Sequence, residues 1–177
     1  MFHSKIELYK LEFKEEALLI EKMIIRPYVI GDETEIAELV ATTMRISNQG
    51  DYSQEDIEKM IIEHSPKFFS ERAAESHFYV ACDNKRIIGC GGITGYWGSK
   101  TESYLLSIFV LPEYQGKGIG TQIVKTLEKD EYFFRAWRTE VGSSITAVDF
   151  YRKLGYEYKN GITTPDEDNV IRLEKRK

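Results

Sequence analysis

Alternate glycines at the junction between two predicted elements constrain this chain most. Residues 105–111 are apolar and rich in branched and aromatic side chains, which predicts a β-strand. Pro112 ends this strand, because proline has no N–H to donate to a sheet. After a short turn, residues 115–120 read Gln-Gly-Lys-Gly-Ile-Gly, and apolar residues then recur every fourth position at Ile119, Ile123 and Leu127. That spacing predicts the buried face of an α-helix.

The glycines predict an anion site where this helix begins. Glycine costs about 1 kcal/mol relative to alanine inside a helix, so repeated glycines need a compensating benefit. The first N–H groups of a helix lack partners and carry partial positive charge, and glycines leave them uncovered for a phosphate or diphosphate. A glycine-rich turn without a ligand is the alternative interpretation. The amides that we expect to bind the anion belong to Gln115, Gly116, Lys117, Gly118, Ile119, Gly120 and Thr121.

Two other phosphate-binding patterns are excluded. The P-loop needs four residues between its first glycine and Gly-Lys-Ser/Thr, whereas Lys117 follows Gly116 directly and no hydroxyl residue follows it. The dinucleotide fingerprint reads G-x-G-x-x-G, whereas this chain reads G-x-G-x-G.

Two motifs in this order resemble a known family. The pattern Gln-x-x-Gly-x-Gly at Gln115, Gly118 and Gly120 is similar to the acyl-CoA-binding signature of the GNAT superfamily of N-acetyltransferases. Residues 147–156, Ala-Val-Asp-Phe-Tyr-Arg-Lys-Leu-Gly-Tyr, resemble the later helix of that superfamily, which ends in Phe-Tyr-x-x-x-Gly-Phe/Tyr. The resemblance covers roughly residues 23–172. It implies an α/β (mixed α+β) fold, with a central, mostly antiparallel mixed sheet splayed at its fourth strand and helices on both faces.

The resemblance also implies how acetyl-CoA would bind. The glycine turn would hold the diphosphate, and the peptide-like pantetheine arm would pair with the backbone of Ile108, Phe109 and Val110 as an additional strand. An N–H of Phe109 or Val110 would stabilise the developing oxyanion. Many members carry an asparagine for the pantetheine three residues before the position of Ala147, where this chain has Ser144, so a shorter hydroxyl replaces that amide.

Tyr151 is the expected proton donor to the departing thiolate. Its position matches the tyrosine that supplies this acid in many GNAT enzymes, and a phenol with a pKa of about 10 can protonate a thiolate whose thiol has a pKa of about 8.5. Core packing is the alternative, because Ala147, Phe150, Tyr151 and Leu154 follow the i, i+3, i+4, i+7 pattern of a buried helix face.

A base must take the proton of the acceptor amine, since an alkylammonium with a pKa of about 10.4 is protonated at neutral pH. Glu102, near the start of the central strand, is the expected base, and Glu113 and His77 are the alternatives. The two helices before the sheet would form one wall of the acceptor site. Aromatic residues that could line this wall, or belong to the core, are Tyr52, His64, Phe68 and Phe69.

The remaining elements follow from local signals. A strand begins at Met23, and a capping box of Asp32 and Glu35 opens the first helix. Ser53 and Asp56 repeat this pattern for a second helix that stops before Pro66. Further strands are predicted at residues 77–82, 86–96, 138–141, 156–158 and 170–173.

No linker or internal repeat divides residues 23–177, so we expect one domain there. Residues 1–22 are an appendage whose pattern fits a helix, a strand arm or a contact surface for a second subunit in a homodimer.

Composition excludes several classes of function. The net charge of −5 argues against a nucleic-acid-binding face. No apolar run approaches the roughly 18 residues of a membrane span, and the first residues lack a cationic segment followed by an apolar core, so we expect a cytoplasmic protein with Cys82 and Cys90 reduced. Three histidines and two cysteines show no metal-ligand spacing.

The sequence therefore predicts transfer of acetyl from acetyl-CoA to a primary amine, on a small molecule or a peptide, by direct attack in a ternary complex without a metal. The alternative is a catalytically silent acyl-CoA-binding or sensing module.

Overall fold

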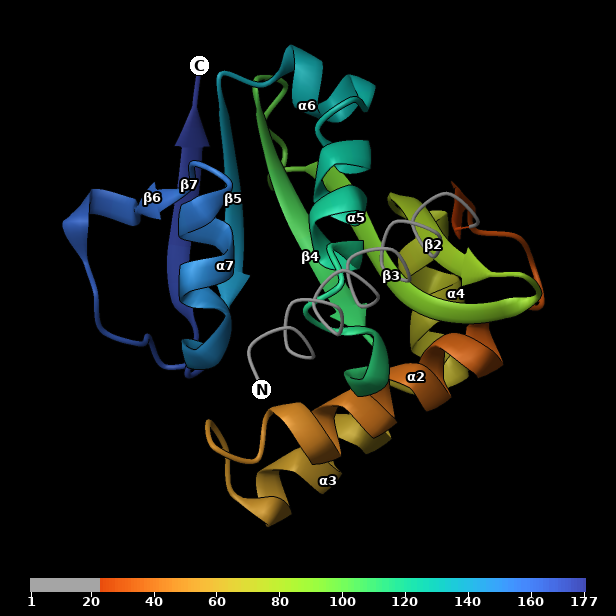
Figure 1. Cartoon of the computed structure of the whole chain (residues 1–177). Coiled ribbons are helices and arrows are strands. Elements are labelled where there is room, and N and C mark those ends of the chain that lie inside the picture. Colours follow the sequence, from red (N-terminus) through yellow and green to blue (C-terminus); the bar gives the residue numbers. More distant parts are fainter. Residues whose placement is uncertain (1–22) are drawn as a thin grey trace, which may run out of the picture.

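A seven-stranded mixed sheet carries helices on both of its faces (Figure 1). This architecture comes from a computed structural model, which describes residues 23–177, so the predictions for residues 1–22 lie outside the described part of the chain. The strand order is β1-β2-β3-β4-β5-β7-β6, and every neighbouring pair is antiparallel except β4 and β5, which are parallel. The predicted fold class is confirmed.

The strands match the predicted ones with small shifts at their ends. They are β1 (Met23–Pro27), β2 (His77–Asp83), β3 (Arg86–Gly95), β4 (Glu102–Val110), β5 (Arg138–Ser143), β6 (Glu157–Tyr158) and β7 (Ile171–Arg176). The helices are α2 (Glu33–Ser47), α3 (Gln54–Glu63), α4 (Pro66–Ala74), α5 (Ile119–Leu127), α6 (Glu131–Arg135) and α7 (Val148–Lys153).

Two of these helices were not predicted. Pro66 ends the preceding segment, but it also occupies the first position of α4, where a missing N–H costs nothing. Ser65 caps this helix by accepting a hydrogen bond from the N–H of Phe68 at 3.3 Å. Asp130 caps the short α6 by accepting from the N–H of Tyr132. Each of these helices therefore begins directly after a serine or aspartate that caps it, which is a helix start signal.

One predicted capping box is wrong and the other cap is confirmed. Asp32 is at the N-cap of α2, but its carboxylate pairs with Arg26 at 2.7 and 2.9 Å instead of capping the helix. The Glu35 carboxylate accepts from the N–H of Ile87 at 2.7 Å, so it reaches the sheet and not the helix start. Ser53 caps α3 as predicted, accepting from the N–H of Asp56.

Strands β4 and β5 separate halfway along β4, as expected from the resemblance. They pair from Glu102–Arg138 to Leu105–Val141, and β4 then continues to Val110 without a partner on this edge (Figure 1). A β-bulge lies at the separation, because Ser107 and Ile108 stand opposite the single residue Gly91. Ser107 has a φ of 50°, a left-handed conformation that a non-glycine residue adopts only when its surroundings enforce it.

The two helical layers pack on opposite faces of β3. On one face, a Cβ atom added to Gly91 would lie 2.8 Å from the side chain of Ile123, so α5 packs directly against the bare backbone. On the other face, Phe78 of β2 lies beside Gly92 and contacts Phe69 of α4, with ring centroids 6.2 Å apart. The apolar residues predicted to face inward on α5, namely Ile119, Ile123 and Leu127, are all buried.

Candidate functional site

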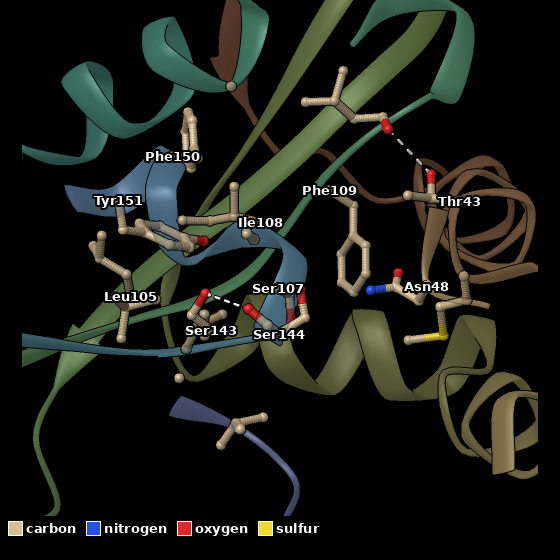
Figure 2. Close-up of a pocket in the computed structure, with 18 of the residues that line it drawn as sticks. Thr43, Asn48, Leu105, Ser107, Ile108, Phe109, Ser143, Ser144, Phe150 and Tyr151 are labelled. Carbon is tan, nitrogen blue, oxygen red and sulfur yellow. Dashed lines mark hydrogen bonds between the residues drawn. The ribbon is translucent and has the colours of Figure 1, made fainter. Parts of the chain in front are cut away.

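A cavity of about 1230 Å³ extends from the splay between β4 and β5 to α2, α3 and α4. Figure 2 shows part of it, with the end of β4 on one side of Tyr151 and the side chain of Phe109 pointing into the space. Most of the residues predicted to bind cofactor line this cavity. They are Ile108, Phe109, Val110, Gln115, Gly116, Gly118, Ile119, Gly120, Thr121 and Ser144, together with the predicted acid Tyr151.

The glycine turn presents a row of free main-chain donors. Gly116 and Gly118 have φ values of 76° and 79°, and Gly118 is the N-cap of α5. The N–H groups from Gly116 to Thr121 donate to no described residue, and the first helical bond runs from the N–H of Gln122 to the carbonyl of Gly118 at 3.0 Å. The N–H of Gln115 is different, because it donates to the carbonyl of Pro112. The row of free amides therefore begins one residue later than predicted.

Gly120 has a packing role as well. A Cβ atom at this position would lie 3.2 Å from Cζ of Phe150, so the glycine lets α7 approach the first turn of α5. The second motif thus contacts the first through Phe150. This contact connects α7, which carries Tyr151, to the glycine turn.

The open edge of β4 is partly occupied by side chains. The carbonyl of Val110 accepts from Oγ1 of Thr43 at 3.2 Å and from Nε2 of Gln115 at 2.9 Å; the bond from Thr43 is drawn in Figure 2. Nε2 of Gln115 also lies 2.9 Å from Oγ of Ser47 on α2. Gln115 therefore fixes the turn to the strand and to α2 through its side chain.

The direction of the backbone distinguishes the two predicted oxyanion donors. The N–H of Leu111 donates to the carbonyl of Ile88 on β3, so the neighbouring N–H of Val110 points to the opposite, open edge. The N–H of Phe109 points toward Cys90 of β3 instead. The geometry therefore favours Val110.

Tyr151 is buried, with 5% of its surface exposed, yet its hydroxyl opens into the cavity. No described residue forms a hydrogen bond with this hydroxyl. Among the described residues, however, every fully buried side-chain polar atom has a hydrogen-bond partner. The hydroxyl oxygen must therefore be accessible from the cavity. Burial raises the pKa of Tyr151 well above the ordinary value, so the phenol stays protonated at neutral pH.

Two of the predicted site residues do not line the cavity. Lys117 places its ammonium 5.3 Å from the centre of the Tyr114 ring, on the outer side of the turn. Glu102 pairs with Arg138 within the sheet, with Oε1 2.6 Å from Nε. This hydrogen bond lowers the pKa of Glu102, which makes its carboxylate a weaker base.

The two alternative bases are also engaged elsewhere. Glu113 pairs with Arg86 at 2.8 Å, and Nδ1 of His77 lies 2.9 Å from the buried carboxylate of Asp130. Neither residue lines the cavity.

The far end of the cavity is aromatic and mixed in charge. His64 and Phe68, which were expected to line the acceptor wall, do so, as does Tyr52, whereas Phe69 is fully buried in the core. Residues that the sequence analysis did not identify also line it: Asn48, Arg72, Glu75, Trp97, Tyr104, Asp168 and Arg172. They come from helices, loops and strands distant in sequence, and no local motif marks them.

Two features are absent from residues 23–177. That part of the chain contains no group of histidine, cysteine, aspartate or glutamate residues able to hold a metal ion. None of its helices has the length and apolar character required to cross a bilayer.

Comparison with known proteins agrees with the fold and the two motifs. Residues 74–158 match the family model described as acetyltransferase (GNAT) domain. The chain is 28% identical over 134 residues to YafP, an N-acetyltransferase of Escherichia coli K12, covering 75% of this chain and 80% of YafP. It is 31% identical over 113 residues to an N-acetyltransferase of Methanocaldococcus jannaschii, covering 56% of this chain and 66% of that protein.

A solved structure has the same fold. The PaiA N-acetyltransferase of Thermoplasma acidophilum, crystallised in complex with coenzyme A, superposes with a TM-score of 0.76 at 21% identity, covering 88% of this chain and 99% of that one. This likeness concerns the fold; the family model over residues 74–158 and the two sequence relatives show that the chain belongs to the GNAT superfamily of acetyltransferases.

Proposed function

We propose that the protein transfers an acetyl group from acetyl-CoA to a primary amine by direct attack in a ternary complex. One observation carries the proposal: the free amides of the glycine turn and the accessible hydroxyl of Tyr151 face the same cavity at the open edge of β4. An anion site, a strand edge and a proton donor are the parts that thioester aminolysis needs. The coenzyme A complex of the Thermoplasma relative supports the choice of acyl carrier.

The cofactor would bind along these groups in order. The N–H groups from Gly116 to Thr121 would hold the diphosphate, aided by the positive end of α5. The pantetheine arm would follow the open edge of β4 past Val110 and Ile108, with the Ser144 hydroxyl on the β5 side. Because Lys117 points away from the cavity, the backbone supplies most of the attraction for the diphosphate.

The reaction would then proceed in two stages. The neutral amine attacks the thioester carbon, and the carbonyl electron pair moves to the oxygen, where the N–H of Val110 stabilises the negative charge. The C–S bond then breaks, the sulfur leaves with the electron pair, and the hydroxyl of Tyr151 donates its proton to it. The nitrogen loses one proton to a base, Tyr151 regains a proton from solvent, and the products are the amide and the free thiol of coenzyme A.

The high pKa of Tyr151 is compatible with this role. Burial raises the pKa of the phenol, and burial of the departing thiolate beside it would also raise the pKa of its conjugate thiol. Both pKa values would therefore shift in the same direction.

A thiol-release assay with acetyl-CoA tests this function. The acceptors would be a small diamine, lysine, glucosamine and a peptide with a free amino terminus. We expect Tyr151→Phe to lower kcat at least about tenfold while acetyl-CoA affinity, measured by calorimetry, stays nearly constant. Tyr156→Phe is the matched control, because Tyr156 is also buried but its hydroxyl donates to Glu128 outside the cavity.

The outcomes separate the candidate functions. Full activity of Tyr151→Phe would remove this residue from the mechanism. Tight acetyl-CoA binding without turnover on any acceptor would favour a silent acyl-CoA-binding module, and absence of binding would exclude both functions.

A further inference from the structure

We propose that Nε2 of His64 is the base that accepts the proton of the acceptor amine. The inference rests on the acetyl transfer proposed above and assigns a catalytic residue to it. His64 immediately follows α3 and lies on the wall of the cavity formed by the helices before β2.

Hydrogen bonding fixes which nitrogen of the ring is available. Nδ1 of His64 lies 2.7 Å from the carbonyl oxygen of Met60, one turn earlier. A carbonyl oxygen only accepts hydrogen bonds, so Nδ1 must carry the proton. In the neutral ring, Nε2 therefore has the free lone pair, which is the state required of a base.

This second nitrogen is open to the cavity. No described residue hydrogen-bonds Nε2 of His64, and every fully buried side-chain polar atom among the described residues has a partner. Nε2 is therefore accessible, and the residue lines the cavity. A base for an incoming amine requires this combination of a bonded Nδ1 and an exposed Nε2.

The ring lies beside the end of β4. Its centroid is 6.4 Å from that of Phe109, which directly precedes the proposed oxyanion donor Val110. Phe68 and Phe69 of α4 contact its other sides at 4.7 and 6.0 Å. The aromatic contacts hold the imidazole in place, so it acts from a fixed position relative to β4.

Burial favours the neutral form of the His64 ring. Burial among the aromatic rings lowers the pKa of His64 below its ordinary value, and the hydrogen bond to Met60 opposes this only in part. Glu63 on α3 raises the pKa and Arg72 on α4 lowers it, while the β4 residue that faces the ring, Phe109, carries no charge.

The carboxylates on the cavity wall are less suitable. Asp168 is engaged in an ion pair with Arg172 at 2.9 Å. Glu75 is exposed beyond the end of α4. Of the two histidines in residues 23–177, His64 lines the cavity, whereas His77 pairs with Asp130 elsewhere.

The proton transfers balance over the whole reaction. As the C–N bond forms, the nitrogen becomes positively charged and acidic, and its proton passes to Nε2 of His64, directly or through one water. Tyr151 gives its proton to the departing sulfur. The imidazolium then returns a proton through solvent to the Tyr151 phenolate, which restores both residues.

The pH dependence of kcat/KM tests the role of His64 with the acceptor that the amine panel identifies. In a plot of log kcat/KM against pH, the expected slope is one above the pKa of His64, where only the amine still has to lose a proton. Below that pKa the expected slope is two, because His64 must also be deprotonated. We expect His64→Gln to lower kcat/KM about 100-fold at pH 7 and to keep a slope of one throughout. Acetyl-CoA affinity should not change, and imidazole added to His64→Ala should restore part of the activity.

His77→Gln is the matched control, because it removes a histidine outside the cavity and should keep the steeper slope. Wild-type turnover in His64→Gln, or a steeper slope that persists in it, would overturn the assignment. A wild-type profile with a slope of one over the whole acidic range would also overturn the assignment. This test does not depend on whether the variants fold. Lack of turnover in the wild type would instead reject the proposed function, and the inference with it.

Discussion

Nε of Arg138 lies 2.6 Å from Oε1 of Glu102, at the point where β4 and β5 begin their parallel pairing. The same guanidinium reaches Glu140 at 2.6 Å and Glu174 at 3.2 Å, so one nearly buried arginine connects β4, β5 and β7. Lys159 adds a second cation at 2.7 Å from Glu140. Glu102 therefore belongs to this ion-pair network of the sheet. It lies next to the region where β4 and β5 separate, not inside that region.

Arg138→Met should destabilise the fold strongly. The substitution leaves carboxylates of three strands without their shared partner, and removing one member of a buried ion pair costs roughly 3–5 kcal/mol. Urea titration followed by circular dichroism would measure the free energy of unfolding. A loss below about 1 kcal/mol would show that the carboxylates find other partners, as exposed pairs do.

Glu102→Gln should affect stability and not chemistry. Glutamine keeps a hydrogen-bonding oxygen near Arg138 but removes the charge, so we expect a lower melting temperature with kcat/KM unchanged. Thermal melting and the thiol-release assay would be compared on the same preparation. A large loss of turnover with an unchanged melting temperature would contradict this prediction and indicate that Glu102 is the base.

Gly118→Ala should weaken both folding and cofactor binding. Gly118 has a φ of 79°, and this left-handed conformation costs an L-residue roughly 1–2 kcal/mol. Relief of that strain would rotate the free amides that follow it. Calorimetry with acetyl-CoA and urea unfolding would quantify the two effects.

Gly50→Ala is the matched control, since a Cβ there meets open space and φ is not in the left-handed range. Equal behaviour of the two variants would contradict a role for the turn geometry.

Asp32→Asn should cost less stability in acid than at neutral pH. The hydrogen bonds from Arg26 lower the pKa of Asp32 in the folded state. A lowered folded pKa adds stability above the unfolded pKa of about 3.9, and this contribution is lost as the pH falls through the folded value. We expect a cost of about 1–2 kcal/mol at pH 7 that shrinks toward pH 3. A cost independent of pH would show that packing, not charge, explains the effect.

The local patterns of the sequence were sufficient for the strands, for α5 and for the glycine turn. Ile119, Ile123 and Leu127 face inward because a helix of that periodicity has only one apolar side, and Pro112 separates the strand from the turn in any context. The motif around Tyr151 was recognisable in the sequence, but its packing against the turn through Phe150 and Gly120 was not predicted.

The remaining features depend on contacts between distant segments. The sequence around Glu102 is compatible with a catalytic base. Its ion pair becomes apparent only from the parallel register of β4 and β5, which places Glu102 opposite Arg138. Thr43 reaches the carbonyl of Val110 across 67 positions of sequence. The orientation of His64 depends on a carbonyl of its own helix and on rings from α4 and β4, a combination that no spacing in the sequence encodes.

Titration calorimetry of the wild-type protein with acetyl-CoA tests the central claim most directly, because the proposed diphosphate site consists of main-chain amides. We predict saturable binding by the wild type and clearly weaker binding by Gly118→Ala. The absence of any heat at millimolar acetyl-CoA, with a protein that is folded by circular dichroism, would contradict the account.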